Sequence, residues 1–306
     1  MKLPRISVVV PTLNQGDLIE TCLRSVIDQD YPDVELIVVD GGSSDSTPNV
    51  LARYQSALAA WIRGPDRGQG DAINKGWSRS TGSILAWLNS DDYYNPGALR
   101  RVAREFVEGQ SVQVVSGGID IVNFQGNLIG HKPTSTFDPE RLLPCGIVPG
   151  QPAVFLGRSV VEAVGPVNTS LHYVLDWEYW LRASRVVEQS ACRYLKESLA
   201  CSREWVGTKT STASVRTAEE YRKVLDSVFS EEMLPPSLAR LQPFAYSQSW
   251  WRQAFAEYRD GNRSRALGSL AHALRMSPRS YTLRQMVAAF AVVLLKPRRL
   301  HFNYHV

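Results

Sequence analysis

The chain has 306 residues, of which 44% are hydrophobic and 21% charged, and its formal net charge is +4. This is a globular composition, and the length suits one large domain with an appendage. The charge is mild and no run of Lys and Arg is interleaved with aromatic residues, which argues against a nucleic-acid partner.

Cysteine usage and the apolar segments indicate a cellular compartment. Cys22, Cys145, Cys192 and Cys201 form no C-x-x-C pair, so we interpret them as reduced thiols of a cytoplasmic protein. The first five residues lead into a β-rich run, which argues against a secretory signal. No stretch approaches the ~20 apolar residues that a membrane-spanning helix needs.

Strands and helices alternate in the first third of the chain. Apolar runs at residues 6–10, 36–39 and 84–88 predict buried strands. Amphipathic segments predict helices that open at Gly16-Asp17, Thr47-Pro48, Asp71 and Asn95-Pro96. Continuous apolar strands alternating with such helices predict a mostly parallel sheet covered on both sides.

The pattern changes after residue 112. Residues 112–115, 119–122 and 128–129 predict a meander, interrupted at Gly117-Gly118 and at residues 125–127. A helix is expected to begin near Asp176. After Pro235-Pro236 the composition predicts helices at 247–258, 263–276 and 280–295, with a domain boundary near 231–242.

Two adjacent carboxylates follow the strand at 84–88, in Asn89-Ser90-Asp91-Asp92. Like charges this close repel, and a cation shared with a phosphate relieves the repulsion. Ligands of α/β sheets bind beyond the carboxyl ends of the strands, and hard oxygen ligands suit Mg²⁺ or Mn²⁺. The alternative is an ordinary turn before Asn95-Pro96-Gly97.

Asp40 closes the strand at 36–39 at the same edge, where its carboxylate can accept hydrogen bonds from a ribose or a base. An Asp-Gly-Gly turn is the alternative.

The chain has neither G-x-G-x-x-G after its first strand nor a Walker A sequence, the two commonest phosphate-binding motifs. The loop at residues 65–76 leads into a helix start that favours anionic ligands, although Asp71 also suits an N-cap and Asn74 and Lys75 also suit the surface.

A second acidic site is Asp176-Trp177-Glu178. Residues two apart do not share a helix face, so one carboxylate can act as a general base while the other faces elsewhere. Trp177 could cover a sugar face. The alternative is a helix N-terminus that is simply rich in acids.

Five motifs in this order resemble the family 2 glycosyltransferases over about residues 5–225. They are residues 7–14, Val39-Asp40-Gly41-Gly42-Ser43-Ser44-Asp45, the Asp66 to Gly76 segment, Thr81-Gly82 and Asn89-Ser90-Asp91-Asp92. The resemblance is greatest to the bacterial O-antigen and exopolysaccharide branch. It implies the glycosyltransferase-A fold, a Rossmann-like α/β sheet, here with a C-terminal helical extension.

The resemblance also implies roles for individual residues. The nucleotide-sugar would contact Pro11, Thr12, Asn14, Asp40, Asp71, Asn74 and Asp91. Asp92 would hold the metal, Mg²⁺ or Mn²⁺, and Asp176 would be the catalytic base. Gln151 and Trp177 would contact the acceptor. Trp205 stands where the family carries a His beside the metal and diphosphate, and Glu204, Thr208 or a water are the candidate substitutes.

The activity implied is inverting transfer of a sugar from a nucleotide-diphosphate-sugar to a glycan or lipid-linked hydroxyl in surface polysaccharide synthesis. Residues 1–232 would be the catalytic domain, with a nucleotide-binding half (1–110) and an acceptor-binding half (111–232), and 233–306 a helical extension. The alternative is a non-catalytic nucleotide-sugar-binding protein or scaffold. A nucleotidyltransferase is disfavoured because Pro11 to Gly16 replace its Gly-rich, basic loop.

Residues 250–279 resemble one helical-repeat unit, for which we favour docking on the catalytic domain. The apolar segment 286–295 precedes Lys296-Pro297-Arg298-Arg299. It either packs as a buried helix with a basic end or makes peripheral contact with the inner membrane surface at its cytoplasmic face.

Overall fold

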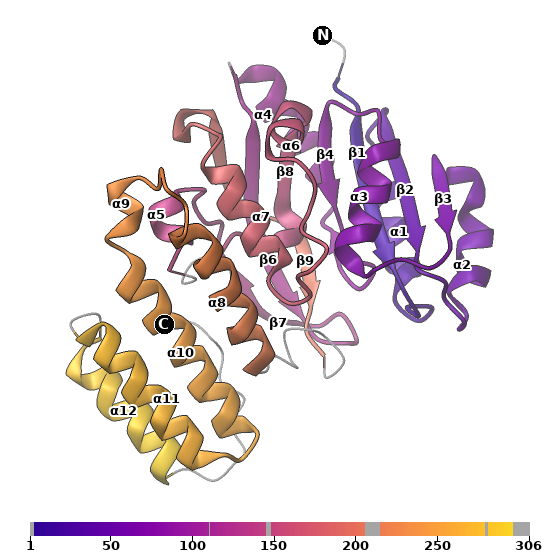
Figure 1. Ribbon diagram of the computed structural model, residues 1–306. Coiled ribbons are helices and arrows are strands. Elements are labelled where there is room, and N and C mark those ends of the chain that lie inside the picture. Colours follow the sequence, from indigo (N-terminus) through magenta and orange to yellow (C-terminus); the bar gives the residue numbers. More distant parts are fainter. Residues whose placement is uncertain (1–2, 110, 145–147, 206–214, 279–280, 296–306) are drawn as a thin grey trace. The chain divides into compact units, whose positions relative to one another are not determined.

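The computed structural model describes residues 3–109, 111–144, 148–205, 215–278 and 281–295, which divide into two compact units. The first unit takes the described residues up to Leu142 and again from 148 to 205. The second takes Leu143, Pro144 and the described residues from Val215 onward. Figure 1 labels most of the helices and strands of both.

The first unit is built on a mixed sheet with the strand order β3-β2-β1-β4-β8-β6-β9-β5, and β7 pairs with β6. The strands are β1 (Ile6–Thr12), β2 (Val34–Asp40), β3 (Ala60–Arg63), β4 (Ile84–Trp87), β5 (Tyr93–Tyr94), β6 (Val114–Val122), β7 (Leu128–Lys132), β8 (Val154–Gly157) and β9 (Cys192–Arg203). Strands β1 to β4 are parallel to one another, and β8 is antiparallel to both β4 and β6. The three apolar runs expected as buried strands are therefore confirmed.

Helices of the first unit connect these strands. They are α1 (Ile19–Ile27), α2 (Thr47–Tyr54), α3 (Gln69–Arg79), α4 (Ala98–Glu108), α5 (Pro139–Leu142), α6 (Arg158–Val164) and α7 (Leu175–Ser184), with short 3-10 turns η1 (Gln55–Ala57), η2 (Gln151–Ala153) and η3 (Gln189–Ala191). The helix expected near Asp176 is α7.

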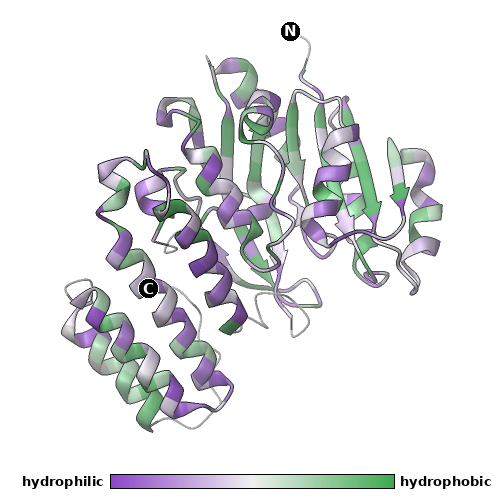
Figure 2. Cartoon of the chain, in the orientation of Figure 1, coloured by the Kyte–Doolittle hydropathy of each residue, from purple (hydrophilic) through white to green (hydrophobic). Residues whose placement is uncertain are grey.

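Successive residues of β1 face opposite sides of the sheet. Val8 and Val10 join the core that includes buried side chains of α1 and α4. Val9 faces α3, where a Cβ added to Gly76 would lie 2.3 Å from Val9 Cγ1. Only glycine therefore lets α3 approach the sheet this closely. Figure 2 shows that the strands are mostly hydrophobic, whereas the helices carry both hydrophobic and hydrophilic residues.

An aromatic cluster fills the α3 side of the sheet. Trp77 of α3, Trp87 of β4 and Tyr179 and Trp180 of α7 have ring centroids 4.8 to 6.1 Å apart. Figure 1 shows α3 and α7 on this one side. Large rings pack both helices against the end of β4, and this packing positions everything that these helices carry.

The expected meander is wrong in one place. Residues 114–122 form one continuous strand, and Gly117-Gly118 do not interrupt it. The two glycines instead accept the close approach of β9, because a Cβ on Gly117 would lie 2.4 Å from Leu199 Cγ. The register with β9 shifts at Gly118, so these glycines mark a bulge and not a turn.

The second unit is helical. Its elements are α8 (Val215–Phe229), α9 (Pro236–Ala239), α10 (Gln242–Arg259), α11 (Arg263–Met276) and α12 (Leu283–Leu295). Helix α8 belongs here because Arg222 stacks on Trp250 at 4.3 Å and donates to Gln253 of α10 at 2.6 Å. The two compact units thus divide ahead of α8, and the end of the catalytic domain at 232 stays a prediction.

Helices α10 and α11 form the hairpin that the repeat-like pattern at 250–279 suggested. Ala254, Ala266 and Leu270 are buried between them, and α12 adds Ala289 and Val293 to the same core. Small residues allow the helices this close contact. Docking of this hairpin on the first unit stays a prediction.

None of the helices in the described part of the chain is both long and apolar enough to cross a bilayer. In α12 the Val293 side chain is buried and Leu294 is 53% exposed. The cations at 296–299 lie outside the described residues. The buried helix and the membrane contact therefore both stay predictions.

Candidate functional site

The carboxyl ends of three parallel strands bring the predicted polar residues to one edge of the sheet. Thr12 at the end of β1 is paired in register with Asp40 at the end of β2. Val9 of β1 is paired with Trp87, after which the chain turns through Asn89 to Asp92. Parallel strands end at the same edge, so Thr12, Asp40 and the Asp91-Asp92 pair share it.

The loops after β1 and β2 are joined to each other by hydrogen bonds. The backbone N–H of Asn14 donates to Ser43 Oγ at 2.8 Å, and Asn14 Oδ1 accepts from the N–H of Ser44 at 2.9 Å. Asn14 has φ of 53°, a left-handed conformation that Asn tolerates. Its side chain thus holds the two loops in shape beside Pro11, which is itself buried.

Asp40 and Thr12 each present a buried oxygen that accepts no hydrogen bond within the described residues. Asp40 is fully buried, and its Oδ1 accepts from the N–H groups of Gly42 and Ser43 at 3.1 and 2.8 Å. Its Oδ2 lies 3.5 Å from Arg63 Nε. Buried polar atoms normally have hydrogen-bond partners. Thr12 Oγ1 has none within the described residues and Asp40 Oδ2 has only the ion pair with Arg63, so these two oxygens indicate a place for a ligand.

Asp92 is 3% exposed, and neighbouring groups hold its carboxylate from two sides. Asn89 Nδ2 donates to Oδ2 at 3.2 Å, and the N–H of Arg203 donates to Oδ1 at 2.9 Å. Gln69 of α3 donates in turn to Asn89 Oδ1 at 2.6 Å. Burial, followed by the charge of Asp91, raises the pKa of Asp92 well above its usual value.

Arg203 at the end of β9 is a site residue that the sequence patterns did not single out. Besides its N–H on Asp92, its Nε donates to the Asp91 carbonyl at 3.1 Å and its Nη1 to the Phe124 carbonyl at 2.5 Å. It therefore ties the acidic turn to β9. Its position two residues before Trp205, in the segment that resembles the family's metal-side stretch, was the available signal.

The acidic turn suits a hard divalent cation shared with a diphosphate. Mg²⁺ in such sites takes one or two carboxylates, the phosphates and water, and Asp91 and Asp92 could supply the carboxylates. No group of three or more His, Cys, Asp or Glu side chains suited to a metal is found in the described residues. Phosphate and water would therefore have to complete the shell.

Trp205, which stands where the family carries a His, lies at the end of a described segment. Trp205 packs edge-on against Phe124, with ring centroids 5.5 Å apart. The N–H of Glu204 donates to the Val122 carbonyl at 2.8 Å, and its side chain is exposed. Thr208, the other candidate substitute, lies outside the described residues.

Asp71 lies in the first turn of α3, whose N-cap is Gly68. Its carboxylate accepts from the side chain and the N–H of Arg67 at 3.0 and 3.1 Å and pairs with Lys75 at 3.1 Å. The Arg67 hydrogen bonds, with a smaller contribution from Lys75, lower the pKa of Asp71 to about 2. Asp71 therefore closes the loop at residues 64–68 and is not the helix cap.

Helix α7 carries the second acidic site. Asp176 is half-buried in its first turn, where its Oδ1 accepts from the N–H of Trp177 at 2.8 Å. Glu178 is turned to Arg182, which donates to both of its carboxylate oxygens at 2.7 and 3.0 Å. Glu178 is thus committed to Arg182 of the same helix, and Asp176 stays the candidate base that the family resemblance implies.

Trp177 is 1% exposed, and its indole donates to the Leu142 carbonyl at 2.8 Å. This placement favours a packing role over the sugar contact expected from the sequence. Trp180, one helical turn after Asp176, stacks on Trp87. The turn that contains Asp176 thereby lies close to the end of β4.

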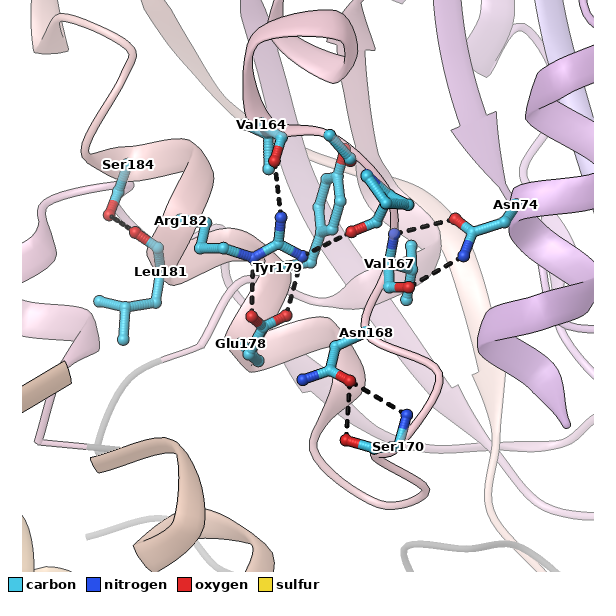
Figure 3. Close-up of polar contacts among 12 residues, drawn as sticks. Asn74, Val164, Val167, Asn168, Ser170, Glu178, Tyr179, Leu181, Arg182 and Ser184 are labelled. Carbon is cyan, nitrogen blue, oxygen red and sulfur yellow. Dashed lines mark hydrogen bonds and ion pairs between the residues drawn. The ribbon is translucent and has the colours of Figure 1, made fainter. Parts of the chain in front are cut away.

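Asn74 and Gln151 both use their amides on backbone groups. Figure 3 shows the Asn74 amide on Val167, donating to its carbonyl at 2.9 Å and accepting from its N–H at 2.8 Å. Gln151 Nε2 donates to the Trp87 carbonyl at 2.7 Å, and its Oε1 is buried with no hydrogen bond within the described residues. Gln151 therefore keeps an acceptor oxygen beside the end of β4.

Known proteins with similar sequences are glycosyltransferases. Residues 7–159 match the family described as Glycosyl transferase family 2. A PGL/p-HBAD biosynthesis glycosyltransferase of Mycobacterium tuberculosis is 32% identical over 188 residues, which cover 60% of this chain and 70% of that protein. An uncharacterized glycosyltransferase of Rickettsia prowazekii is 26% identical over 243 residues, covering 76% of this chain and 74% of that protein.

Solved structures share the fold at low sequence identity. TarS of S. aureus (residues 1–349, in complex with UDP-GlcNAc) has a TM-score of 0.62 at 15% identity, with 94% of this chain and 90% of that chain covered. The mannosyltransferase PcManGT of Pyrobaculum calidifontis, in complex with GDP-Man and Mn²⁺, has a TM-score of 0.62 at 19% identity, with 95% and 81% covered. The expected glycosyltransferase-A fold, with helices at its C-terminal end, is confirmed.

Proposed function

This chain belongs to glycosyltransferase family 2 and is a glycosyltransferase, and we propose that it transfers a sugar, with inversion, from a nucleotide-diphosphate-sugar to an acceptor hydroxyl. The main support for a nucleotide-diphosphate-sugar donor is the group of polar residues at one edge of the sheet. There two buried oxygens, on Thr12 and Asp40, accept no hydrogen bond within the described residues, and the Asp91-Asp92 turn follows the adjacent strand.

In this proposal the nucleoside lies over the ends of β1 and β2. Asp40 Oδ2 would accept from a base N–H or a ribose hydroxyl, and Thr12 Oγ1 would pair beside it. The loops that Asn14 holds, together with Pro11, would form the floor. The N-terminal end of α3 would face the diphosphate.

Asp92, with Asp91 beside it, would hold Mg²⁺ or Mn²⁺. When bound, the cation supplies charge neutralisation to the departing diphosphate. Burial raises the pKa of Asp92, and a bound cation would lower it again because it favours the ionised carboxylate. The Mn²⁺ complex of PcManGT supports this choice of metal.

Asp176 is proposed as the base. As the acceptor oxygen forms its bond to the anomeric carbon, its proton passes to the Asp176 carboxylate, and the bond from that carbon to the diphosphate oxygen breaks. The electron pair leaves with the nucleoside diphosphate. Attack from the face opposite the leaving group inverts the anomeric configuration.

The acceptor would lie between the Gln151 oxygen and Asp176, since both are adjacent to the Trp87–Trp180 pair. We propose a hydroxyl of a glycan or lipid-linked precursor in surface polysaccharide synthesis. The support is the motif resemblance to the O-antigen and exopolysaccharide branch. The relative named for PGL/p-HBAD biosynthesis leaves that branch a proposal.

A thermal-shift panel of UDP-, GDP-, dTDP- and CMP-sugars, with and without Mn²⁺, tests the donor. A ligand that binds only the folded chain stabilises it with the logarithm of its excess over Kd, so the right donor should raise Tm above the others. That donor should then release its nucleoside diphosphate on incubation with the chain. A panel in which no nucleotide-sugar shifts Tm would contradict the proposal.

A further inference from the structure

Residues Val164 to Ser170, which we call the strap, connect α6 to the segment just before α7. Side chains of α7 hold the carbonyls at its start. Arg182 Nη1 donates to the Val164 carbonyl at 2.7 Å and its Nη2 to the Pro166 carbonyl at 2.9 Å, and Tyr179 Oη donates to the Gly165 carbonyl at 3.1 Å. Glu178 balances the charge of Arg182, so the guanidinium is fixed from both sides (Figure 3).

Helix α3 holds the next residue of the strap. Both functional groups of the Asn74 amide bond the backbone of Val167, which is 93 positions away in sequence. One turn earlier, a Cβ on Gly70 would lie 3.3 Å from the Asn168 carbonyl oxygen, so the helix and the strap are in direct contact. The strap is therefore clamped between α3 and α7.

These contacts connect the helix at the proposed donor site with the helix that carries the proposed base. The first turn of α3 faces the proposed diphosphate, and the first turn of α7 carries Asp176. We propose that Asn74 is a positioning residue that sets the place of Asp176 relative to the donor, by fixing the strap that leads into α7. This inference rests on the proposed function, because it takes Asp176 as the base.

The two roles predict different kinetics. The Val167 bonds use the oxygen and one N–H of the Asn74 amide, so they fix the orientation of the amide and tie it to the strap. The positioning role predicts a loss in kcat with the donor Kd unchanged. A donor contact, as the sequence motif suggested, predicts the opposite.

The test compares wild type with Asn74→Ala in the full-length chain. The probe is UDP-GlcNAc or GDP-mannose, whichever stabilises the wild type more, with release of UDP or GDP as the rate. We expect kcat to fall about 10- to 100-fold, because small displacements of a reacting group cost that much. The donor Kd, from thermal shift, should stay within about twofold. Unchanged kcat, or a loss confined to Kd or KM, overturns the inference.

A second variant keeps the test sharp if Asn74→Ala fails to fold. Asn74→Asp retains an acceptor for the Val167 N–H but sets a carboxylate oxygen against the Val167 carbonyl. Protonation restores a donor. The Val167 carbonyl opposite the new carboxylate favours protonation, and the cation of the adjacent Lys75 opposes it. The ratio of variant to wild-type kcat should therefore rise as the pH falls from about 8 to about 5. A ratio independent of pH contradicts the clamp.

Two further variants separate the possible failures. Ser184→Ala removes a hydrogen bond to the Leu181 carbonyl within α7 and leaves the strap untouched, so its kcat should equal that of wild type. Asp176→Asn tests the base itself. Near-native turnover in Asp176→Asn, or none in the wild type, would overturn the proposed function and this inference with it. Loss in Asp176→Asn with full kcat in Asn74→Ala would overturn this inference alone.

Discussion

The indole of Trp180 stacks on the indole of Trp87, with ring centroids 4.8 Å apart and planes inclined by 16°. Trp87 ends β4, and the acidic turn with Asp92 follows it. Asp176 lies one turn before Trp180, which is about 6 Å along the helix. This one contact therefore relates the proposed metal site to the proposed base.

Removing the stacked ring should destabilise the first unit. Trp180 is 1% exposed and also packs edge-on against Phe137 at 5.7 Å. Trp180→Ala should lower the free energy of unfolding by about 3–5 kcal/mol, and Trp180→Phe by clearly less. Urea denaturation measures both. Ile129→Ala, at a side chain that is 54% exposed, serves as the control and should change little.

Thr12→Val should separate binding from stability. The substitution replaces a buried hydroxyl that has no hydrogen bond within the described residues with a methyl group of similar size. Tm without ligand should hold or rise, since no bond of the chain itself is lost. The donor Kd should weaken about fivefold, equivalent to ~1 kcal/mol. Unaltered donor affinity would remove Thr12 from the binding site.

Asp92→Asn should abolish the part of donor binding that depends on Mn²⁺. The change removes the charge but keeps an acceptor oxygen for the Arg203 N–H. Tm with donor alone should match wild type, and the additional increase on adding Mn²⁺ should disappear. The control is Asp30→Asn, whose side chain is 97% exposed. A full Mn²⁺ increment in Asp92→Asn would refute the ligand assignment.

Asp71 should make stability depend on acid pH. Its folded pKa of about 2 lies below the usual aspartate value of 3.8, so the ionised form stabilises the fold above about pH 4. That contribution is lost as the pH falls from about 4 to about 2. Asp71→Asn should cost about 1 kcal/mol at neutral pH, after allowance for solvent screening by the exposed Arg67. The gap between variant and wild type should close in acid. A constant gap from pH 7 to about 2 would contradict the account.

Much of the fold could be predicted from local patterns. The strands at 6–10, 36–39 and 84–88 are continuous apolar runs, and the helix at 263–276 has the bounds that its periodicity predicts. Patterns of this kind are local in sequence. The position of Thr12, Asp40 and Asp92 at one edge of the sheet could also be predicted, because parallel strands place their carboxyl ends together.

Contacts distant in sequence could not be predicted in the same way. Nothing near Asn74 indicates that its amide bonds Val167, and nothing near Trp177 shows that its indole faces Leu142. Gly117-Gly118 have the pattern of a turn, and only the position of Leu199 explains them as a bulge. In each case the partner lies in another element, so tertiary packing decides the role of the residue.

The most direct test of the central claim is turnover by Asp176→Asn, measured as nucleoside diphosphate released from the donor that stabilises the wild type. We predict a fall of at least about 100-fold, because a general base is lost, with the donor and Mn²⁺ thermal shifts retained. Glu188→Gln, at an exposed carboxylate beyond α7, should keep the wild-type rate. Near-native turnover by Asp176→Asn would contradict the account.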